Sequence, residues 1–257
     1  MNWHLLITGA SSGIGEAIAR AALARGARVT LVARRRSLLE QIAQSAPDRC
    51  RVIEADLSQL EVAERVLDDA ASGHGPVDVL VNNAGRQIVA PTVATEWNDA
   101  LSMMRLDLLM PMRLATLILP KMIERGQGTL VDIASMAGIA PTPGMYFYNA
   151  AKAGLAAASE GLRAEVKRHG IHVVTVYPGP VSTELERAGR AAYEESFMVR
   201  AVPTGRAEVL AERIFDAIEH RRPRVIYPRI YALSRHFPNA TRWLLDAMTP
   251  PAKQLGR

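Results

Sequence analysis

Cysteine, long apolar runs and blocks of like charge are scarce in this 257-residue chain. Cys50 is the single cysteine, so the chain can form neither an internal disulfide nor a cysteine cluster for a metal. No apolar run approaches the roughly 18 residues of a membrane span, and the first residues lack the basic and apolar regions of a signal peptide. These absences lead us to expect a cytoplasmic protein in a reducing compartment.

The charged residues are numerous but dispersed. The chain has 31 basic and 26 acidic residues, for a formal charge of +5, and its arginines run together at residues 34–36 and 221–224. Because this excess is mild and scattered, we expect no nucleic-acid partner. The six histidines show no paired-ligand spacing, and we expect no metal site.

The chain does contain a regular alternation of two hydrophobic patterns. Short, almost continuously apolar runs, suited to strands covered on both faces, occupy residues 5–7, 28–32, 51–55, 77–81, 128–133, 172–177 and 224–227. Segments of helical period occupy residues 14–25, 60–71, 107–125, 150–169 and 206–220. The alternation predicts a single α/β domain over residues 1–257, with a doubly wound, Rossmann-type parallel sheet of about seven strands and helices on both faces.

A glycine-rich turn, TGASSGIG, joins the first strand to the first helix. Strand, glycine turn and helix together present the free N–H groups of a helix N-terminus to a pyrophosphate. Gly9 would allow the tight turn, Gly13 the close approach of the phosphates, and Gly15 the packing of helix on strand. The dinucleotide-binding residues predicted here are Gly9, Ser11, Ser12, Gly13, Ile14 and Gly15.

The glycine spacing G-x-x-x-G-x-G and the motifs that follow it resemble the short-chain dehydrogenase/reductase family. Those motifs, spread over residues 5–227, are Asp56-Leu57, Asn82-Asn83-Ala84-Gly85, Ser135, Tyr148 with Lys152, and Pro178-Gly179. The resemblance implies a small-molecule carbonyl or alcohol substrate and a homodimer or homotetramer. The further cofactor residues that it implies are Asp56 and Leu57 at the adenine, Asn83, Ala84 and Gly85 at the adenosine and ribose, and Pro178, Gly179, Val181 and Thr183 along the nicotinamide.

The end of the second strand bears on the choice of nucleotide. In a dinucleotide fold an acidic residue there selects NAD, whereas a basic residue tolerates the 2′-phosphate of NADP. The chain reads Val32-Ala33-Arg34-Arg35-Arg36, with no carboxylate, and an arginine offers a bidentate fork to a phosphate. We therefore predict NADP(H) in preference to NAD(H), bound first by Arg34 and next by Arg35; a solvated basic loop is the alternative.

Tyr148 and Lys152 stand one helical turn apart in the sequence YNAAK. A phenol with a pKa of about 10 is a poor base near neutral pH, and a nearby cation favours its phenolate. Hydride transfer between a nicotinamide and a carbonyl requires a group that exchanges a proton with the oxygen. We predict that Tyr148 is this group, that Lys152 tunes it, and that Ser135 donates a hydrogen bond to the substrate oxygen, unless Ser135 is only a turn cap. The resemblance adds that Lys152 binds the nicotinamide ribose.

Asp107 occupies the position where the resemblance calls for an asparagine. That asparagine helps to hold, largely through its main-chain carbonyl, a water that contacts the catalytic lysine. An aspartate keeps the carbonyl, loses two N–H donors and adds a carboxylate. Two hypotheses stay open: the proton relay survives because an anion suits Lys152, or Asp107 marks weakened catalysis.

The C-terminal third carries the predicted substrate side. We expect residues 184–202 to form a long substrate lid, with Tyr193, Phe197 and Met198 as apolar contacts, and Tyr146 to line the pocket. Residues 229–257 form an amphipathic tail that packs on the body or on a partner subunit, or contacts a membrane surface. Some family members with a similar tail act on lipid-like or steroid-like carbonyls, so the resemblance favours a hydrophobic substrate.

These features predict an NADP(H)-dependent oxidoreductase that interconverts a carbonyl and an alcohol. A regulatory or scaffold protein that keeps the nucleotide site but has weakened catalysis is the alternative, because of Asp107. A sugar-nucleotide epimerase is disfavoured by the glycine spacing and by the short C-terminal region.

Overall fold

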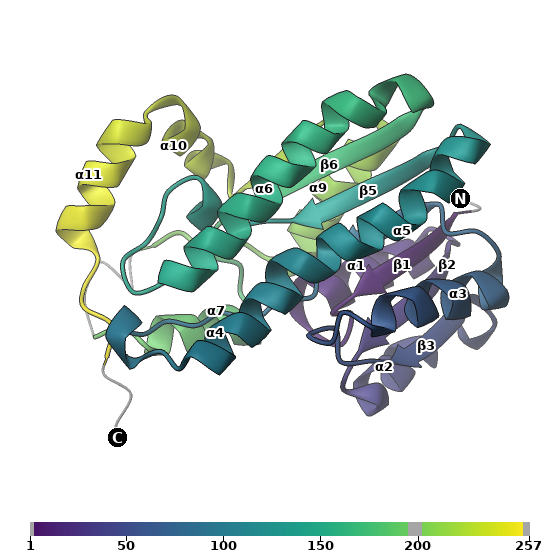
Figure 1. Cartoon of the computed structure of the whole chain (residues 1–257), viewed down its shortest axis with the longest axis horizontal. Coiled ribbons are helices and arrows are strands. Elements are labelled where there is room, and N and C mark those ends of the chain that lie inside the picture. Colours follow the sequence, from purple (N-terminus) through teal and green to yellow (C-terminus); the bar gives the residue numbers. More distant parts are fainter. Residues whose placement is uncertain (1–2, 195–201, 254–257) are drawn as a thin grey trace.

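The computed structural model describes residues 3–194 and 202–253. In this part of the chain, seven strands form one parallel sheet in the order β3-β2-β1-β4-β5-β6-β7 (Figure 1). The strands are β1 (His4–Thr8), β2 (Arg28–Ala33), β3 (Cys50–Glu54), β4 (Val79–Asn82), β5 (Gly128–Ile133), β6 (Ile171–Pro178) and β7 (Arg224–Tyr227). Each lies within two residues of the run that predicts it.

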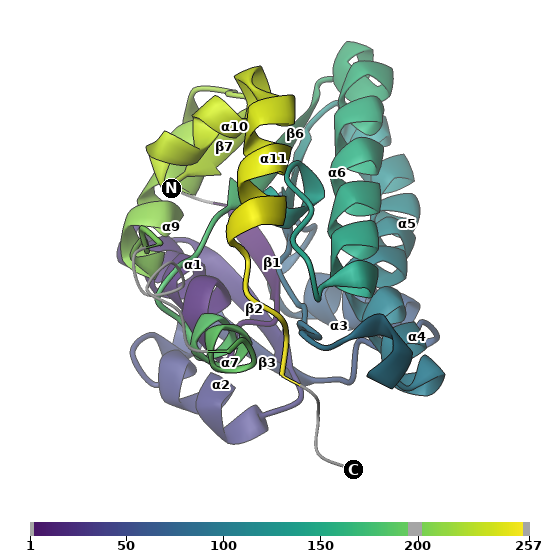
Figure 2. The ribbon, with the colours of Figure 1, turned by 90° about the vertical axis from the view of Figure 1, so that its left-hand side faces the viewer.

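Helices cover both faces of the sheet. The described helices, some of which lie beyond the ends of the strands (Figure 2), are α1 (Gly13–Ala24), α2 (Arg36–Ala43), α3 (Val62–His74), α4 (Trp97–Met104), α5 (Met110–Arg125), α6 (Tyr146–Val166), α7 (Glu184–Ala191), α9 (Ala207–Glu219), α10 (Leu233–His236) and α11 (Pro238–Met248). Shorter turns are η1 (Pro47–Arg49), η2 (Thr92–Ala94), η3 (Arg105–Leu109, π-helical), η4 (Met136–Gly138), η5 (Lys167–His169) and η6 (Arg229–Ala232). Figure 2 shows α1, α2 and α9 on one face and α3, α5 and α6 on the other. The predicted doubly wound parallel fold is confirmed.

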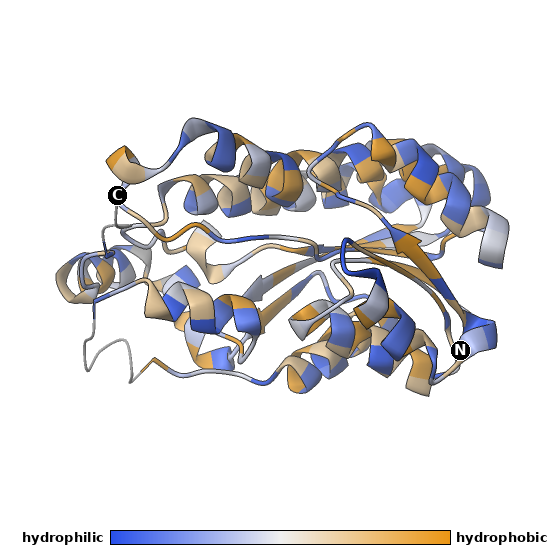
Figure 3. Cartoon of the chain, turned by 90° about the horizontal axis from the view of Figure 1, so that it is seen from below, coloured by the Kyte–Doolittle hydropathy of each residue, from blue (hydrophilic) through white to orange (hydrophobic). Residues whose placement is uncertain are grey.

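The apolar runs become strands because the fold buries them on both sides. Every residue of β6 is buried, as is every residue of β1 and β4. One core cluster joins the sheet to α1 and α9, and a second joins it to α3 and α5. Figure 3 shows apolar strands enclosed between two helical layers. Continuous burial explains why these strands lack the alternating pattern of a half-exposed sheet.

Two helical predictions differ from the structure. The segment expected to be one helix over residues 107–125 is α5 preceded by the π-helical turn η3, so Asp107 lies in that turn and not in an α-helix. Hydrophobic periodicity does not register one extra residue in a turn, which is why the pattern missed it. The first half of the expected lid, residues 184–191, is the helix α7. Thr183 begins α7 by accepting a hydrogen bond from Glu186 N (3.2 Å).

The strand order places the functional residues at one edge of the sheet. The order reverses between β1 and β4, and in such sheets ligands bind outside the carboxyl ends of the strands at this switch point. The glycine turn follows β1 and the Asn83–Gly85 segment follows β4. Figure 2 shows α7 and α11 across this same end of the sheet.

Candidate active site

The glycine turn after β1 approaches the segment after β4 so closely that side chains are excluded. Gly9 has φ +65°, and a Cβ there would lie 2.7 Å from the Cα of Ala84. Gly13 has φ +60°, and its Cβ would lie 3.0 Å from Thr183 Cγ2. Since φ values in this range strain any residue with a Cβ, both positions require glycine. The turn therefore presents bare backbone to the cavity.

Thr8 and Asn83 fasten this turn to the segment after β4. Thr8 Oγ1 accepts hydrogen bonds from the main-chain N–H groups of Asn83 (2.9 Å) and Ala84 (3.0 Å). The Asn83 side chain donates to Thr8 O (2.9 Å) and Gly9 O (3.2 Å). A Cβ on Gly15 would overlap the Asn83 amide, so the glycine lets α1 reach this clamp. The sequence interpretation missed Thr8, whose signal was its place directly before Gly9.

The two arginines after β2 lie in different settings. Arg35 Nη2 donates to Ser12 Oγ (2.7 Å) and Ser11 Oγ (3.2 Å), which places its guanidinium on the glycine turn. The same group contacts Glu184 Oε2 of α7 at 3.3 Å. Arg34 also lines the cavity, on the side of Asp56.

Asp56 and Leu57 line the same end of the cavity. Asp56 Oδ1 accepts hydrogen bonds from the backbone N (3.0 Å) and the hydroxyl (2.8 Å) of Ser58. The backbone bond from Ser58 holds the pKa of the Asp56 carboxyl below its ordinary value, and Arg34 adds to the effect. Asp56 is therefore an ionised acceptor at neutral pH.

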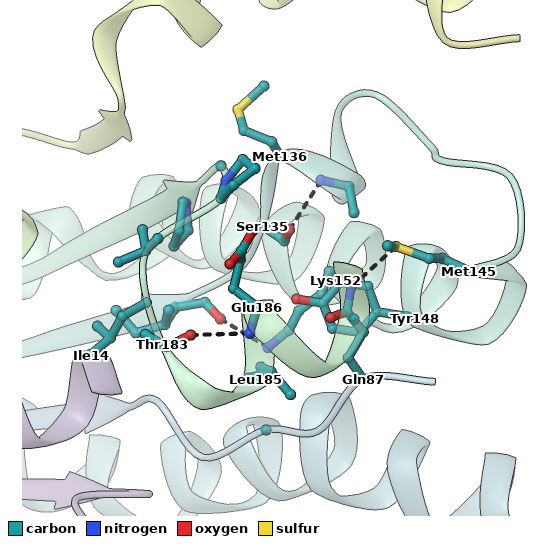
Figure 4. Close-up of a pocket in the computed structure, with 18 of the residues that line it drawn as sticks. Ile14, Gln87, Ser135, Met136, Met145, Tyr148, Lys152, Thr183, Leu185 and Glu186 are labelled. Atoms are coloured by element: carbon teal, nitrogen blue, oxygen red, sulfur yellow. Dashed lines mark hydrogen bonds between the residues drawn. The ribbon is translucent and has the colours of Figure 1, made fainter. Parts of the chain in front are cut away.

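Ser135 and Tyr148 meet beyond the carboxyl end of β5. Ser135 Oγ accepts a hydrogen bond from Ala137 N (3.1 Å) and so begins the turn η4. The same side chain acts on the Tyr148 phenol, whose pKa it helps to lower. Ser135 thus caps the turn and also lines the cavity, and its hydrogen bond to a substrate oxygen stays a prediction. Figure 4 shows Ser135, Tyr148 and Lys152 together at the cavity, with Ile14 and Thr183 further along it.

Lys152 is held between β5 and the π-helical turn. Its Nζ donates to Ile133 O (3.0 Å) and lies 3.2 Å from Asp107 Oδ2. Asp107 Oδ1 accepts a hydrogen bond from Arg86 N (2.9 Å). The resemblance gives this position a main-chain role, whereas in the structure the side chain itself contacts the lysine. Lys152 Nζ also lies 5.8 Å from the centre of the Tyr148 ring.

Burial and charge act against each other in this cluster. Burial raises the pKa of Tyr148, and Lys152 opposes that effect. Burial by itself lowers the pKa of Lys152, but Asp107 and Tyr148 outweigh it, so the lysine pKa is raised and its proton is held firmly. Burial likewise raises the pKa of Asp107, against the contacts from Lys152 and Arg86.

One cavity of about 850 Å³ connects the glycine turn with Tyr148 and Lys152. The segment after β6 crosses it: Gly179 N donates to Tyr227 O (2.7 Å), and Val181 forms an isolated bridge with Gly205. The predicted site residues that line the cavity are Gly9, Ser11, Ser12, Gly13, Ile14, Arg34, Arg35, Asp56, Leu57, Asn83, Ala84, Gly85, Asp107, Ser135, Tyr148, Lys152, Pro178, Gly179, Val181, Thr183 and Tyr193.

Of the predicted substrate contacts that the structure describes, one lines the cavity and one does not. Tyr193 is buried at the cavity, and its hydroxyl donates to Pro143 O (2.7 Å). Tyr146 was expected to line the pocket, but it is 64% exposed and packs edge-on against Phe147, outside the described cavity wall. Two residues along a helix rotate a side chain by about 200°, so Tyr146 and Tyr148 face opposite ways. Phe197 and Met198 lie outside the described residues.

The sequence predicts Tyr193 and an apolar tail at the outer part of the cavity, but it did not point to Gln87. Gln87 Nε2 contacts Met145 Sδ at 3.2 Å beside Tyr148. Helix α11 adds an apolar wall whose signal was the spacing of large residues along the tail. The α11 residues of this wall are Thr241, Leu244, Leu245 and Met248.

In the described part of the chain, no cluster of three or more His, Cys, Asp or Glu side chains could hold a metal ion. None of the described helices is long and apolar enough to cross a membrane.

Comparisons with known proteins agree with this geometry. The family model for short chain dehydrogenases matches residues 4–194. A fatty acyl-CoA reductase of Mycobacterium tuberculosis is 32% identical over 98% of this chain and 85% of its own length. An uncharacterized oxidoreductase of Staphylococcus aureus strain N315 is 31% identical over 80% of this chain and 87% of its own.

Two solved structures share the whole architecture. A short-chain dehydrogenase from Streptomyces avermitilis superposes with a TM-score of 0.82 at 32% identity, covering 95% of each chain. One from Sphingobium yanoikuyae, in complex with NADPH, gives 0.80 at 29% identity over 99% of each. The fold and site thus define an oxidoreductase of the Rossmann type, and the chain belongs to the short-chain dehydrogenase family.

Proposed function

We propose that this protein is an NADP(H)-dependent oxidoreductase that interconverts a carbonyl and an alcohol. The observation that carries the proposal is the convergence of Ser135, Tyr148 and Lys152 on the cavity that also contains the glycine turn. A proton donor, a hydroxyl for the oxygen and a fixed cation are what the reduction of a carbonyl requires.

The residues of the cavity fit a dinucleotide. The bare backbone at Gly9 and Gly13 and the N-terminus of α1 suit a pyrophosphate, and Asp56 suits an amino group. The relative from Sphingobium yanoikuyae was solved with NADPH. When bound, the reduced nicotinamide supplies a hydride to the carbonyl carbon.

Tyr148 and Ser135 act on the oxygen. Ser135 donates a hydrogen bond to the carbonyl oxygen as negative charge develops there. Tyr148 gives its phenolic proton to that oxygen, so that hydride and proton together convert C=O to CH–OH and leave a phenolate. Lys152 stabilises the phenolate until a solvent proton restores the phenol; alcohol oxidation runs these transfers in reverse.

The preference for NADP(H) rests on the arginines after β2. Arg35 already binds two hydroxyls of the glycine turn, and Arg34 stands at the same end of the cavity. A hydrogen bond to a charged group contributes about 1.5–3 kcal/mol, so Arg35→Ala or Arg34→Ala should raise the KM for NADPH about 10- to 100-fold.

The control for that test is Arg36→Ala, because Arg36 is an exposed residue paired with Glu40 on α2. It should leave both nicotinamide KM values unchanged, and neither cavity variant should alter the KM for NADH. An unmutated protein that uses NADH more efficiently than NADPH would refute the preference.

The substrate side is apolar. Leu244, Leu245 and Met248 of α11 line the cavity, as does Leu185 of α7. The relative named a fatty acyl-CoA reductase also covers the tail. We therefore propose a carbonyl substrate with an extended hydrophobic group. Leu244→Ser should raise the KM for long-chain aldehydes more than the KM for short-chain ones. Trp243→Ser, at an exposed position off the cavity wall, should raise neither.

The reaction class is tested with a panel of aldehydes, ketones and alcohols, followed at the nicotinamide absorbance band with NADPH and NADH in parallel. Turnover of hydrophobic carbonyls with NADPH is the expected result. Tyr148→Phe removes the proton donor and should abolish turnover while cofactor binding persists. Full activity of that variant, or no turnover across the panel, would count against the proposal.

The remaining expectations stand as proposals. We propose a cytoplasmic homodimer or homotetramer, consistent with the partly exposed Met112 and Leu109 near the start of α5. We propose that the tail packs on the protein body rather than on a membrane. Sedimentation analysis and liposome pelleting with and without residues 229–257 test these proposals.

A further inference from the structure

A buried carboxylate lies against the ammonium group that faces Tyr148. Asp107 Oδ2 is 3.2 Å from Lys152 Nζ. Asp107 is 0% exposed, Lys152 4% and Tyr148 8%, so little water reaches the three groups. Charges screened so weakly act strongly on their immediate neighbours.

The pair of Asp107 and Lys152 carries no net charge, whichever member holds the shared proton. An ionised carboxylate cancels the ammonium, and a carboxylic acid beside a free amine is neutral as well. An asparagine at position 107 would instead leave Lys152 as an uncompensated cation. That cation is what favours the phenolate form of a neighbouring tyrosine. Asp107 therefore reduces the influence of Lys152 on Tyr148.

We propose that Asp107 is a positioning residue that offsets much, but not all, of the Lys152 charge and so keeps Tyr148 a protonated phenol throughout the neutral pH range. Tyr148 is then ready to give its proton to a carbonyl oxygen, and it acts as a base toward an alcohol only at alkaline pH. The inference rests on the proposed function and assigns to it a working direction, carbonyl reduction.

The other charged groups around the pair and the cavity are Arg86, which acts on Asp107, Asp132, which acts on Lys152, and Glu186 and Arg190, which pair with each other on the cavity wall. The groups that act on the phenol itself are Lys152, Asp107 and Ser135. The shifts at Tyr148 run the same way: burial raises its pKa, Lys152 lowers it, and Asp107 acts in the same direction as burial.

The segment after β4 packs closely against this pair. A Cβ on Gly85 would lie 2.9 Å from Asp107 Oδ2 and 3.4 Å from Lys152 Nζ, so the segment after β4 leaves room for the carboxylate. The π-helical turn carries Asp107 into the core, where Arg86 N fixes its second oxygen. Turns of this kind recur at functional sites.

The test is a titration of Tyr148 in the ligand-free protein. Tyrosinate absorbance is followed against pH in wild type and in Asp107→Asn, each compared with its Tyr148→Phe counterpart to isolate the one phenol. Asp107→Asn should lower the midpoint by about one to two pH units, which raises the phenolate fraction at neutral pH about 10- to 100-fold. The pH profile of alcohol oxidation should move down by the same interval.

Asp132→Asn is the matched control. Asp132 is also a buried carboxylate, but it bonds the Asn82 amide (2.8 Å) and acts on Lys152 less strongly than Asp107 does. Its midpoint shift should be the smaller one. Asp107→Ser removes the same charge and serves if the asparagine variant does not fold.

An unchanged or raised midpoint in the Asp107 variants overturns the inference, as does an equal shift in Asp132→Asn. Because the titration needs neither cofactor nor substrate, it distinguishes failure of this inference from failure of the proposed reaction.

Discussion

Gly85→Ala is the most direct perturbation of the buried pair. The added methyl would stand 2.9 Å from Asp107 Oδ2, about half an ångström inside an ordinary contact. The carboxylate has little room to retreat, because it is fully buried and its other oxygen is bonded to Arg86 N at 2.9 Å. Overpacking of this kind costs about 2 kcal/mol, or about 4–8 °C in Tm for a chain of this size.

The same displacement should slow the proposed carbonyl reduction. If the methyl pushes Asp107 and Lys152 apart by a few tenths of an ångström, Lys152 shifts relative to Tyr148. Misplacement on the ångström scale costs about 100-fold in rate, so we expect a loss of about 10- to 100-fold in kcat for carbonyl reduction. The assays are a thermal melt followed by circular dichroism and a steady-state rate with saturating NADPH.

Gly161→Ala supplies the control on α6, the helix that carries Lys152. A Cβ at Gly161 meets no described atom within 4 Å. Replacing an exposed helical glycine by alanine stabilises a helix by about 0.5–1 kcal/mol, so this variant should melt slightly higher and keep its activity. If Gly85→Ala matched wild type in both Tm and kcat, the crowding inferred around the pair would be wrong.

Two further changes test an ion pair between α6 and β7 and the cap of α7. Both carboxylate oxygens of Glu160 accept hydrogen bonds from Arg224 (2.6 and 2.7 Å), and these bonds lower the pKa of Glu160 in the folded protein. The ion pair therefore stabilises the fold fully above the unfolded-state pKa of about 4.3, and this stabilisation is lost as the pH falls below that value. Glu160→Gln should lower Tm by about 3–6 °C at pH 7, and melts at successively lower pH should show that difference shrinking below about pH 4; a constant difference would argue against the ion pair. Thr183→Ala removes the cap of α7, costing about 1 kcal/mol, and should raise the KM for NADPH about three- to tenfold, whereas Thr183→Ser should retain it.

The sequence predicts a segment correctly where the residues of that segment alone determine its conformation. The apolar run Gly128–Ile133 predicts β5 to the residue, because full burial on both faces leaves an unbroken hydrophobic stretch. The glycine turn predicts its own geometry, because φ values of +65° and +60° suit glycine. The segment Arg105–Leu109, by contrast, holds no local sign of a π-helical turn.

The short surface helices were harder to predict from the sequence because they are too brief to show a helical period. Helices α2, α4 and α7 have eight residues each, too few turns for a clear period against the polar background. Tyr146 and Tyr148 are both aromatic residues of one helix, and only the position of α6 on the sheet decides which of them is buried.

The sequence by itself determined the strands of the sheet, the glycine turn and the pair of Tyr148 and Lys152, since each depends on residues adjacent in the chain or one helical turn apart. Ser135 was found by its place directly after an apolar strand. Tertiary structure alone decided three further matters: that Arg35 binds the serines of the turn, that α11 walls the cavity, and that Asp107 contacts Lys152. These are contacts between distant segments, fixed by how helices and turns pack on the sheet. No local pattern encodes such a contact, because the packing of the whole chain provides it.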